Sequence, residues 1–282
     1  MGGKNLGKVR QDFVQVKGRR IFINIVGEGE VIIFLHGGPG SNHKFFLPHV
    51  LPLSENFKLV LYDQSGCGKS DHLVNNDYSM EDEVETLEML RQKLKLDKLN
   101  LFGESWGTIL ALLYATTHPD KVNKLFLTAA IGISSNGYKQ FPKELLKRMT
   151  ILDKIKLFIV DKKMKKGKAS MKEMLKVIDP YYVYSCDNLQ KKDQTPINSV
   201  VNNRIGTDIS NNYDLIPKVH ALSNIPIIVA QGSDDIIKPT KIKELLLDYI
   251  PHARLVEIEN SGHWTVVEKS SELNRIATEF FQ

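Results

Sequence analysis

Short apolar segments alternate along most of the chain with longer segments in which apolar residues recur every three or four positions. Residues 31–35 form an unbroken apolar run, as expected for a strand that is buried on both faces. Residues 79–94 predict a helix, because a Ser-x-x-Asp capping pattern precedes apolar residues at helical spacing. Further strands are predicted at 57–62, 98–102, 122–130, 225–230 and 254–258, and further helices at 105–117, 240–249 and 267–281. Together with an N-terminal hairpin at 13–26, this alternation predicts an α/β fold with a mostly parallel sheet flanked by helices.

Between residues 133 and 219 the strand pattern is missing. Residues 142–160 predict one helix, a capping box at 170–173 predicts the start of another, and the lysine-rich run 162–168 predicts a solvated loop. The segment has 17 Lys and Arg against 9 Asp and Glu, a net charge of +8, whereas the whole chain is +5 and its remainder therefore −3. This contrast predicts a helical insertion, or lid, at 133–219 within a main domain formed by residues 1–132 and 220–282.

With 282 residues, 42% of them hydrophobic, the chain is long enough to bury a large core. Its two cysteines, Cys67 and Cys186, are too few for a disulfide framework, so we expect a cytoplasmic protein. No apolar stretch reaches the length of a transmembrane helix. Residues 1–6 lack the apolar region of a signal peptide, and Leu6 does not fit the myristoylation pattern. We therefore expect no membrane span.

The sequence GESWG at 103–107 has the pattern G-x-S-x-G and lies between a predicted strand and a predicted helix. In this setting the pattern is typical of a nucleophile elbow, a sharp turn that presents a serine at strained backbone angles. Ser105 is therefore the candidate nucleophile. The oxyanion that forms during acyl transfer needs backbone donors, and we expect these to be the N–H groups of Trp106 and of Gly38, which lies in the glycine-rich loop 36–40.

A serine nucleophile also needs a base that accepts its proton and an acid that orients this base. In the chain order Ser…Asp…His, the acid should follow the strand at 225–230, where spacing leaves Asp234 and Asp235 both possible. The base should follow the strand at 254–258, and His263 is the histidine in that position.

Other ligand-binding patterns are incomplete. The sequence GCGKS at 66–70 ends like a phosphate-binding loop, but Asp63 stands where the first glycine is required. The third glycine of a dinucleotide-binding fingerprint would fall on Asp71. No His and Cys cluster indicates a metal, and the lysine run lacks the interleaved aromatic residues of a nucleic-acid site. We therefore expect no cofactor, no metal and no nucleic-acid partner.

Five motifs in this order resemble the α/β-hydrolase superfamily. They are HGGPG at 36–40, YDQSGCGKS at 62–70, GESWG at 103–107, GxxD…P at 232–239 and GH at 262–263. The first two look most like the proline iminopeptidase (prolyl aminopeptidase) branch. The resemblance implies an α/β-hydrolase fold with an inserted lid, and it selects Asp235, which lies three residues after the glycine as in the family pattern. It also implies that Ser105 is the nucleophile, His263 the base, and Gly38 and Trp106 the oxyanion donors.

Two features differ from the aminopeptidase pattern. Glu104 stands where the branch often has glycine, and the basic insertion has only two glutamates, Glu144 and Glu173, to bind a substrate amino group, with Asp208 and Asp214 as the other candidates. We therefore predict a serine hydrolase that cleaves a small ester, or the amide of a short peptide, through an acyl-enzyme. A carboxylesterase without aminopeptidase activity is the alternative, and a non-catalytic ligand-binding relative is a further one. The candidate substrate-binding residues are Glu104, Tyr138, Tyr181, Tyr182 and Trp264.

Overall fold

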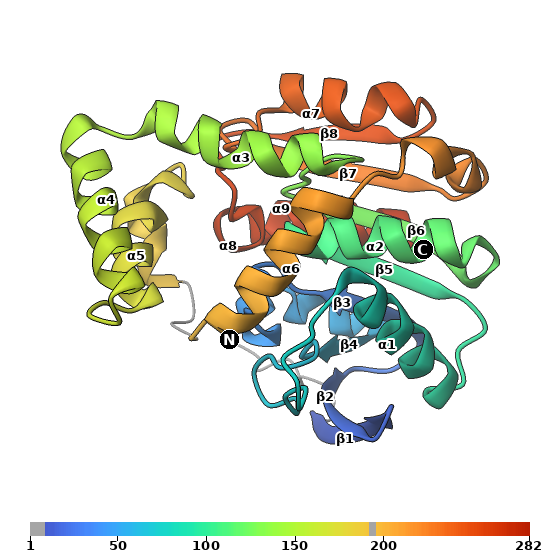
Figure 1. The fold of residues 1–282 in the computed structure, drawn as a ribbon. Coiled ribbons are helices and arrows are strands. Elements are labelled where there is room, and N and C mark those ends of the chain that lie inside the picture. The colour runs from blue at the N-terminus through green and yellow to red at the C-terminus, as the bar shows by residue number, and fades with distance from the viewer. Residues whose placement is uncertain (1–8, 192–195) are drawn as a thin grey trace, which may run out of the picture.

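The computed structural model describes residues 9–191 and 196–282, and within these ranges eight strands form one sheet (Figure 1). The strand order is β1-β2-β4-β3-β5-β6-β7-β8. The pairs β1–β2 and β2–β4 are antiparallel, and the remaining pairs are parallel. The strands are β1 (Arg10–Val16), β2 (Arg19–Val26), β3 (Glu30–Leu35), β4 (Phe57–Tyr62), β5 (Leu99–Glu104), β6 (Val122–Thr128), β7 (Ile227–Gly232) and β8 (Arg254–Ile258). The predicted hairpin and the mostly parallel sheet are confirmed, whereas the predictions for residues 1–6 lie outside the described residues.

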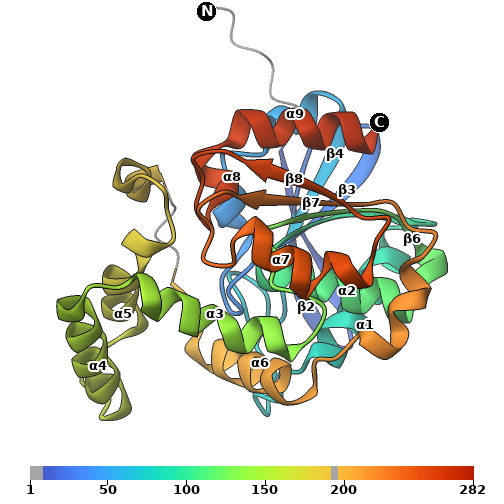
Figure 2. The ribbon, with the colours of Figure 1, turned by 90° about the horizontal axis from the view of Figure 1, so that it is seen from above.

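Helices cover both faces of the sheet, as predicted. Alternate residues of β3 belong to different cores, because neighbouring side chains of a strand point to opposite faces. Ile33 and Leu35 pack in the core that also contains residues of the helices on one face, and Ile32 and Phe34 pack in the core on the other. The first face carries α1 (Met80–Lys93), α2 (Trp106–Thr117), α6 (Ser199–Asn212) and α7 (Pro239–Leu245), and the second carries α8 (Thr265–Glu268) and α9 (Ser270–Phe281) (Figures 1 and 2).

Several predicted helices have different limits in the structure. The single helix expected at 142–160 is two helices, α3 (Ser135–Arg148) and α4 (Ile151–Lys165). The break occurs because the Thr150 hydroxyl accepts a hydrogen bond from the Asp153 N–H at 3.2 Å and so caps a new helix. Pro142, expected near a helix start, lies inside α3. Of the lysine run predicted as a loop, residues 162–165 continue α4 instead, since lysine favours helix. The helix ends at Lys165, and residues 166–168 form a turn in which Gly167 has a φ of +66°.

The segment between β6 and β7 contains α3, α4, α5 (Met171–Ile178) and α6. The predicted capping box opens α5, where the Ser170 N–H donates to Glu173 Oε2 at 2.8 Å. Helices α4 and α5 project away from the sheet, whereas α6 packs on its first face, where it contacts α3 and α1 (Figures 1 and 2). Buried residues of α6 belong to the larger core. In the part of the chain that the structure describes, no helix is long and apolar enough to cross a membrane.

Candidate active site

Ser105 lies at the junction of β5 and α2, with φ 52° and ψ −115°. A non-glycine residue in this region of backbone space is strained, and the surrounding packing must hold it there. A Cβ atom on Gly103 would lie 2.5 Å from the Gly107 carbonyl oxygen, and one on Gly107 would lie 2.0 Å from the Leu35 carbonyl oxygen. Both positions therefore exclude any side chain, and the close approach of β5, α2 and β3 produces the sharp turn.

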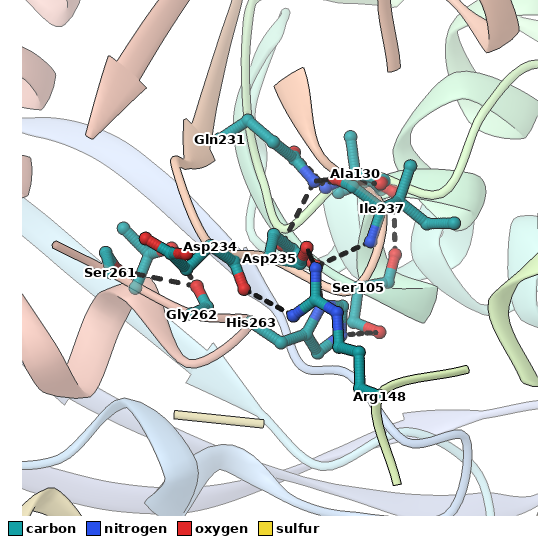
Figure 3. A network of polar contacts seen from close by, with 12 residues as sticks. Ser105, Ala130, Arg148, Gln231, Asp234, Asp235, Ile237, Ser261, Gly262 and His263 are labelled. Carbon is teal, nitrogen blue, oxygen red and sulfur yellow. Dashed lines mark hydrogen bonds and ion pairs between the residues drawn. The ribbon is translucent and has the colours of Figure 1, made fainter. Parts of the chain in front are cut away.

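The Ser105 hydroxyl contacts a buried histidine and, through it, a buried aspartate (Figure 3). His263 Nδ1 lies 2.9 Å from Asp235 Oδ1, and His263 Nε2 lies 3.0 Å from Ser105 Oγ. Because the carboxylate only accepts hydrogen bonds, Nδ1–H is the donor to Asp235 and Nε2 is left to accept from the serine. The three residues named from the motifs thus form one continuous hydrogen-bond relay.

The neighbouring aspartate makes other contacts. The Asp234 carboxylate accepts from the Ser233 hydroxyl at 2.9 Å, whereas Asp235 is fully buried and holds His263. Asp235 Oδ1 also accepts from the Ile237 N–H at 3.1 Å, and its Oδ2 accepts from Gln231 Nε2 at 3.0 Å. These bonds hold both oxygens of the Asp235 carboxylate in place. They distinguish Asp235 from Asp234, which spacing in the sequence could not do.

Two charged side chains, which the sequence analysis did not identify, tie the segment between β6 and β7 to this relay. Arg148, at the end of α3, donates to the carbonyl oxygens of Asp234 and Asp235 (Figure 3). Glu268, in α8, accepts from the Gly262 N–H at 2.6 Å and from the Tyr184 N–H at 2.9 Å. The loop that carries His263 and the loop that carries Asp235 are therefore each bonded to the helical segment.

The environment of His263 shifts its pKa upward. Burial is the largest single influence and lowers the pKa, but the charge of Asp235, its hydrogen bond and the charge of Glu104 together raise it above the usual 6.5. The imidazole ring also packs edge-on against two aromatic rings, with centroid distances of 4.8 Å to Phe141 and 5.3 Å to Tyr182. These rings hold the imidazole over Ser105 and shield the relay from water.

The two candidate oxyanion donors line one pocket with Ser105. Trp106 is the first residue of α2, where an N–H group has no acceptor within the helix. Gly38 has a φ of +120°, which a side chain would disfavour. Gln64 joins both regions, because its Nε2 donates to the His36 carbonyl oxygen at 2.9 Å and its Oε1 accepts from Trp106 Nε1 at 2.7 Å. Gln64 belongs to the motif at 62–70, but the sequence did not indicate this contact.

The pocket above Ser105 has a volume of about 330 Å³. Of the predicted substrate-binding residues, Glu104, Tyr138, Tyr182 and Trp264 line it. Tyr181 is not among its lining residues in the described part of the chain, because its hydroxyl bonds instead to Asp153 Oδ2 at 2.7 Å and to the Thr150 N–H at 3.2 Å.

Helix α5 forms a wall of the pocket that the sequence analysis did not identify. Four apolar residues, spaced by three, one and three positions, line it together with the acidic residue that follows the helix. They are Met171, Met174, Leu175, Ile178 and Asp179. The helical spacing was the available signal, but spacing alone does not tell whether such a face meets a protein core or a cavity. Within the described residues, no group of three His, Cys, Asp or Glu side chains is arranged to hold a metal ion.

A strained serine between a strand and a helix, in a mostly parallel sheet covered on both faces, defines the class of the protein: it is a hydrolase with the α/β-hydrolase fold. The family model described as alpha/beta hydrolase fold matches residues 30–150. The chain is 25% identical to the proline iminopeptidase of Clostridioides difficile (strain 630), over 97% of this chain and 98% of that protein. It is 27% identical to the proline iminopeptidase of Lactobacillus crispatus (strain ST1), over 90% and 92% of the two chains.

Solved structures share the fold. The esterase from Exiguobacterium antarcticum superposes with a TM-score of 0.75 at 21% identity, over 97% of this chain and 98% of that one. The structure of VinJ also gives a TM-score of 0.75, at 20% identity over 96% and 97% of the two chains. The similarity to proline iminopeptidases therefore comes from the sequence, and the structural neighbours establish the architecture.

Proposed function

We propose that the protein is a serine hydrolase that acts through an acyl-enzyme. The observation that carries the proposal is the relay from Ser105 through His263 to Asp235, with bonds of 3.0 and 2.9 Å. His263 Nε2 takes the hydroxyl proton as Ser105 Oγ attacks the substrate carbonyl, and the Asp235 carboxylate stabilises the imidazolium that forms. The N–H groups of Trp106 and Gly38 then donate to the oxyanion of the tetrahedral intermediate.

The reaction is completed by the same groups. The imidazolium returns its proton to the leaving amine or alcohol as the tetrahedral intermediate collapses to the acyl-enzyme. A water molecule then gives a proton to His263 and attacks the acyl carbon, and Ser105 Oγ leaves with the proton that His263 returns. The pocket rim, where Phe141 and Tyr182 cover the imidazole, favours these transfers by limiting bulk water.

The substrate we favour is an aminoacyl amide or a short peptide with a free amino end. Two carboxylates, Glu104 and Asp179, lie in a pocket whose other walls are mostly apolar. A cationic amino group pairs most strongly with carboxylates where little water competes. Both charges also act on Tyr182, whose pKa is raised by burial first, then by Asp179, and further by Tyr138, Asp235 and Glu104. The named relatives, proline iminopeptidases, support the same substrate class.

The second candidate is a carboxylesterase without aminopeptidase activity. The apolar wall formed by α5, together with Phe141 and Leu145 of α3, favours an uncharged acyl chain. We also propose that the segment 133–219 is the lid of the main domain, which comprises residues 1–132 and 220–282, because α3 and α5 supply much of the pocket wall. The cytoplasmic location stays a prediction.

The experiment compares Ser105→Ala with the unchanged protein on p-nitrophenyl acetate, short acyl esters and prolyl-naphthylamide. Loss of the nucleophile should lower kcat by about 10⁴-fold or more while leaving the folded state intact. Ser223→Ala, a serine exposed away from the pocket, is the matched control and should be fully active. Retained turnover in Ser105→Ala would refute the mechanism, and ester-only activity would select the carboxylesterase. If a fluorophosphonate probe fails to label Ser105, the protein is a ligand-binding relative rather than an enzyme.

A further inference from the structure

Helix α4 presents a row of apolar side chains on its outer surface. The row follows the spacing i, i+1, i+4, i+7 and i+8, which places all five residues on one face of a helix. They are Ile151, Leu152, Ile155, Phe158 and Ile159, which we call the apolar stripe; their exposure runs from 46% to 76%. Large apolar side chains are rarely gathered in this way on the surface of a protein that has no partner.

The opposite side of α4 packs against the rest of the molecule. Leu157 packs with Val177 and Ile178 of α5, and Asp153 accepts from the Tyr181 hydroxyl. Helix α4 is therefore attached to the molecule by its inner face, and Figures 1 and 2 both show it at the outer edge, far from the sheet. The apolar stripe is free to meet another surface without any rearrangement of the fold.

A group of lysines continues the stripe at the end of α4. They are Lys162, Lys163, Lys165, Lys166 and Lys168, which we call the lysine cluster; all of them are exposed. Lys162 Nζ lies 4.3 Å from the centre of the Phe158 ring, so the apolar stripe and the lysine cluster are contiguous. Residues 151–168 contain seven Lys and two Asp, a net charge of +5.

This combination fits one occupant best. An amphipathic helix with exposed Ile, Leu and Phe and with lysines at its border binds the interface of an anionic lipid bilayer. The apolar side chains enter the acyl boundary while the lysine stems extend to the phosphate groups. A second copy of this chain is a poorer partner, because docking the two apolar stripes would bring two such positive segments together without compensating charge.

We propose that α4 docks the protein onto an anionic phospholipid surface through the apolar stripe and the lysine cluster. Docking leaves the helix lying on the membrane rather than crossing it. Because α4 packs on α5, and α5 lines the pocket above Ser105, the bound surface lies next to a wall of the pocket. The proposal does not depend on which substrate the pocket accepts.

The test measures binding of the full chain to vesicles of phosphatidylcholine alone, or of phosphatidylcholine and phosphatidylglycerol in equal amounts, by co-sedimentation at several salt concentrations. One variant combines Ile155→Ser and Phe158→Ser, and a second combines Lys162→Glu, Lys163→Glu and Lys166→Glu. The matched control reverses three exposed lysines near the end of α1 and gives the same net charge: Lys93→Glu, Lys95→Glu and Lys98→Glu. Circular dichroism and hydrolysis of a soluble ester check that each variant is folded.

We expect the unchanged protein to bind the anionic vesicles, to bind less as salt rises, and not to bind phosphatidylcholine alone. The lysine variant should lose on the order of 100-fold or more in partition coefficient, because each lysine near such a surface contributes about fivefold and each new glutamate is repelled by the anionic lipids. The stripe variant should lose about tenfold or more, and the control should stay within a few-fold of the unchanged protein.

Three results would each overturn the proposal. The first is equal binding to both kinds of vesicle, and the second is equal loss in the control and the lysine variant. The third is a dimer in sedimentation velocity that dissociates in the stripe variant without any vesicle binding, since the stripe would then be covered by a second copy.

Discussion

The side-chain amide of Gln231 is buried and bonds to the loop that carries Asp235 and to the chain after β6. Its Oε1 accepts from the Ala130 N–H at 2.8 Å, and its Nε2 donates to the Ile237 carbonyl oxygen at 2.8 Å and to Asp235 Oδ2 at 3.0 Å. Gln231, Asp235 and Ala130 are all fully buried. We predict that Gln231→Met, which keeps the volume but removes the amide, destabilises the protein and slows catalysis.

The size of the effect follows from the groups left without a partner. The substitution leaves one buried N–H, one buried carbonyl oxygen and one oxygen of a buried carboxylate unsatisfied. A neutral group in this state costs about 1–3 kcal/mol, and a charged one costs more. Allowing for partial relaxation, the free energy of unfolding should fall by about 3–6 kcal/mol, a large part of the 5–15 kcal/mol typical of a folded protein. The loosened carboxylate should lower kcat by roughly 10- to 100-fold.

Urea denaturation followed by circular dichroism measures the stability, and ester hydrolysis in the absence of urea measures kcat. Thr128→Val is the matched control, because the Thr128 hydroxyl is also buried but has no hydrogen-bond partner among the described residues. Removing a polar group without a partner should leave stability unchanged or slightly higher. A Gln231→Met variant that unfolds within about 1 kcal/mol of the unchanged protein would show that the amide does not hold this loop.

Two further predictions concern pH. Burial raises the pKa of the Glu83 carboxyl from 4.5 to about 7. Between these two pH values the folded state keeps a proton that the unfolded state releases. The free energy of unfolding should therefore fall by about 3 kcal/mol as the pH rises from 4.5 to about 7. Glu83→Gln keeps the acceptor for the Ser65 N–H but removes the buried charge that forms at high pH. In urea titrations it should stabilise the protein at about pH 8 but hardly at pH 4.5. An equal gain at both pH values would contradict this. The rate should rise with pH as His263 loses its proton, and because Glu104 helps to raise this pKa, Glu104→Gln should move the acid limb of kcat/KM to lower pH. An unchanged or upward-shifted limb in profiles from about pH 5 to 8 would show that the Glu104 charge does not act on the base.

Patterns that depend on neighbours in the sequence predicted the fold well. The strands, the Ser79 cap of α1 and the capping box of α5 were all predicted, because apolar periodicity and capping are local properties. The motif around Ser105 was recognisable for a similar reason, because its glycines are required where the backbone packs too closely for a side chain. The break between α3 and α4 was missed, because the apolar spacing continues across it. Thr150 acts as a helix cap only through its extended backbone conformation, which the sequence pattern did not indicate.

Local sequence patterns could not predict contacts between segments that are distant in the chain. Spacing could not separate Asp234 from Asp235, because the distinction depends on which carboxylate the fold turns toward His263. Tyr181 and Tyr182 are adjacent and chemically alike, yet one bonds α4 and the other lines the pocket. Aromatic residues in helical segments serve as core or as pocket wall according to tertiary packing, which the sequence does not display.

The same long-range contacts link substrate selection to catalytic geometry. Arg148, whose helix lines the pocket, donates to the carbonyl oxygens of the loop that holds Asp235. Glu268 joins the loop of His263 to the chain that follows α5, through the N–H groups of Gly262 and Tyr184. In the proposed mechanism, a displacement of α3 by a bulky acyl group therefore pulls on the loop of Asp235, and a displacement of α5 pulls on the loop of His263. Because the relay needs both its bonds near 3 Å to move a proton, a substrate that fits the pocket poorly should lower kcat as well as raise KM.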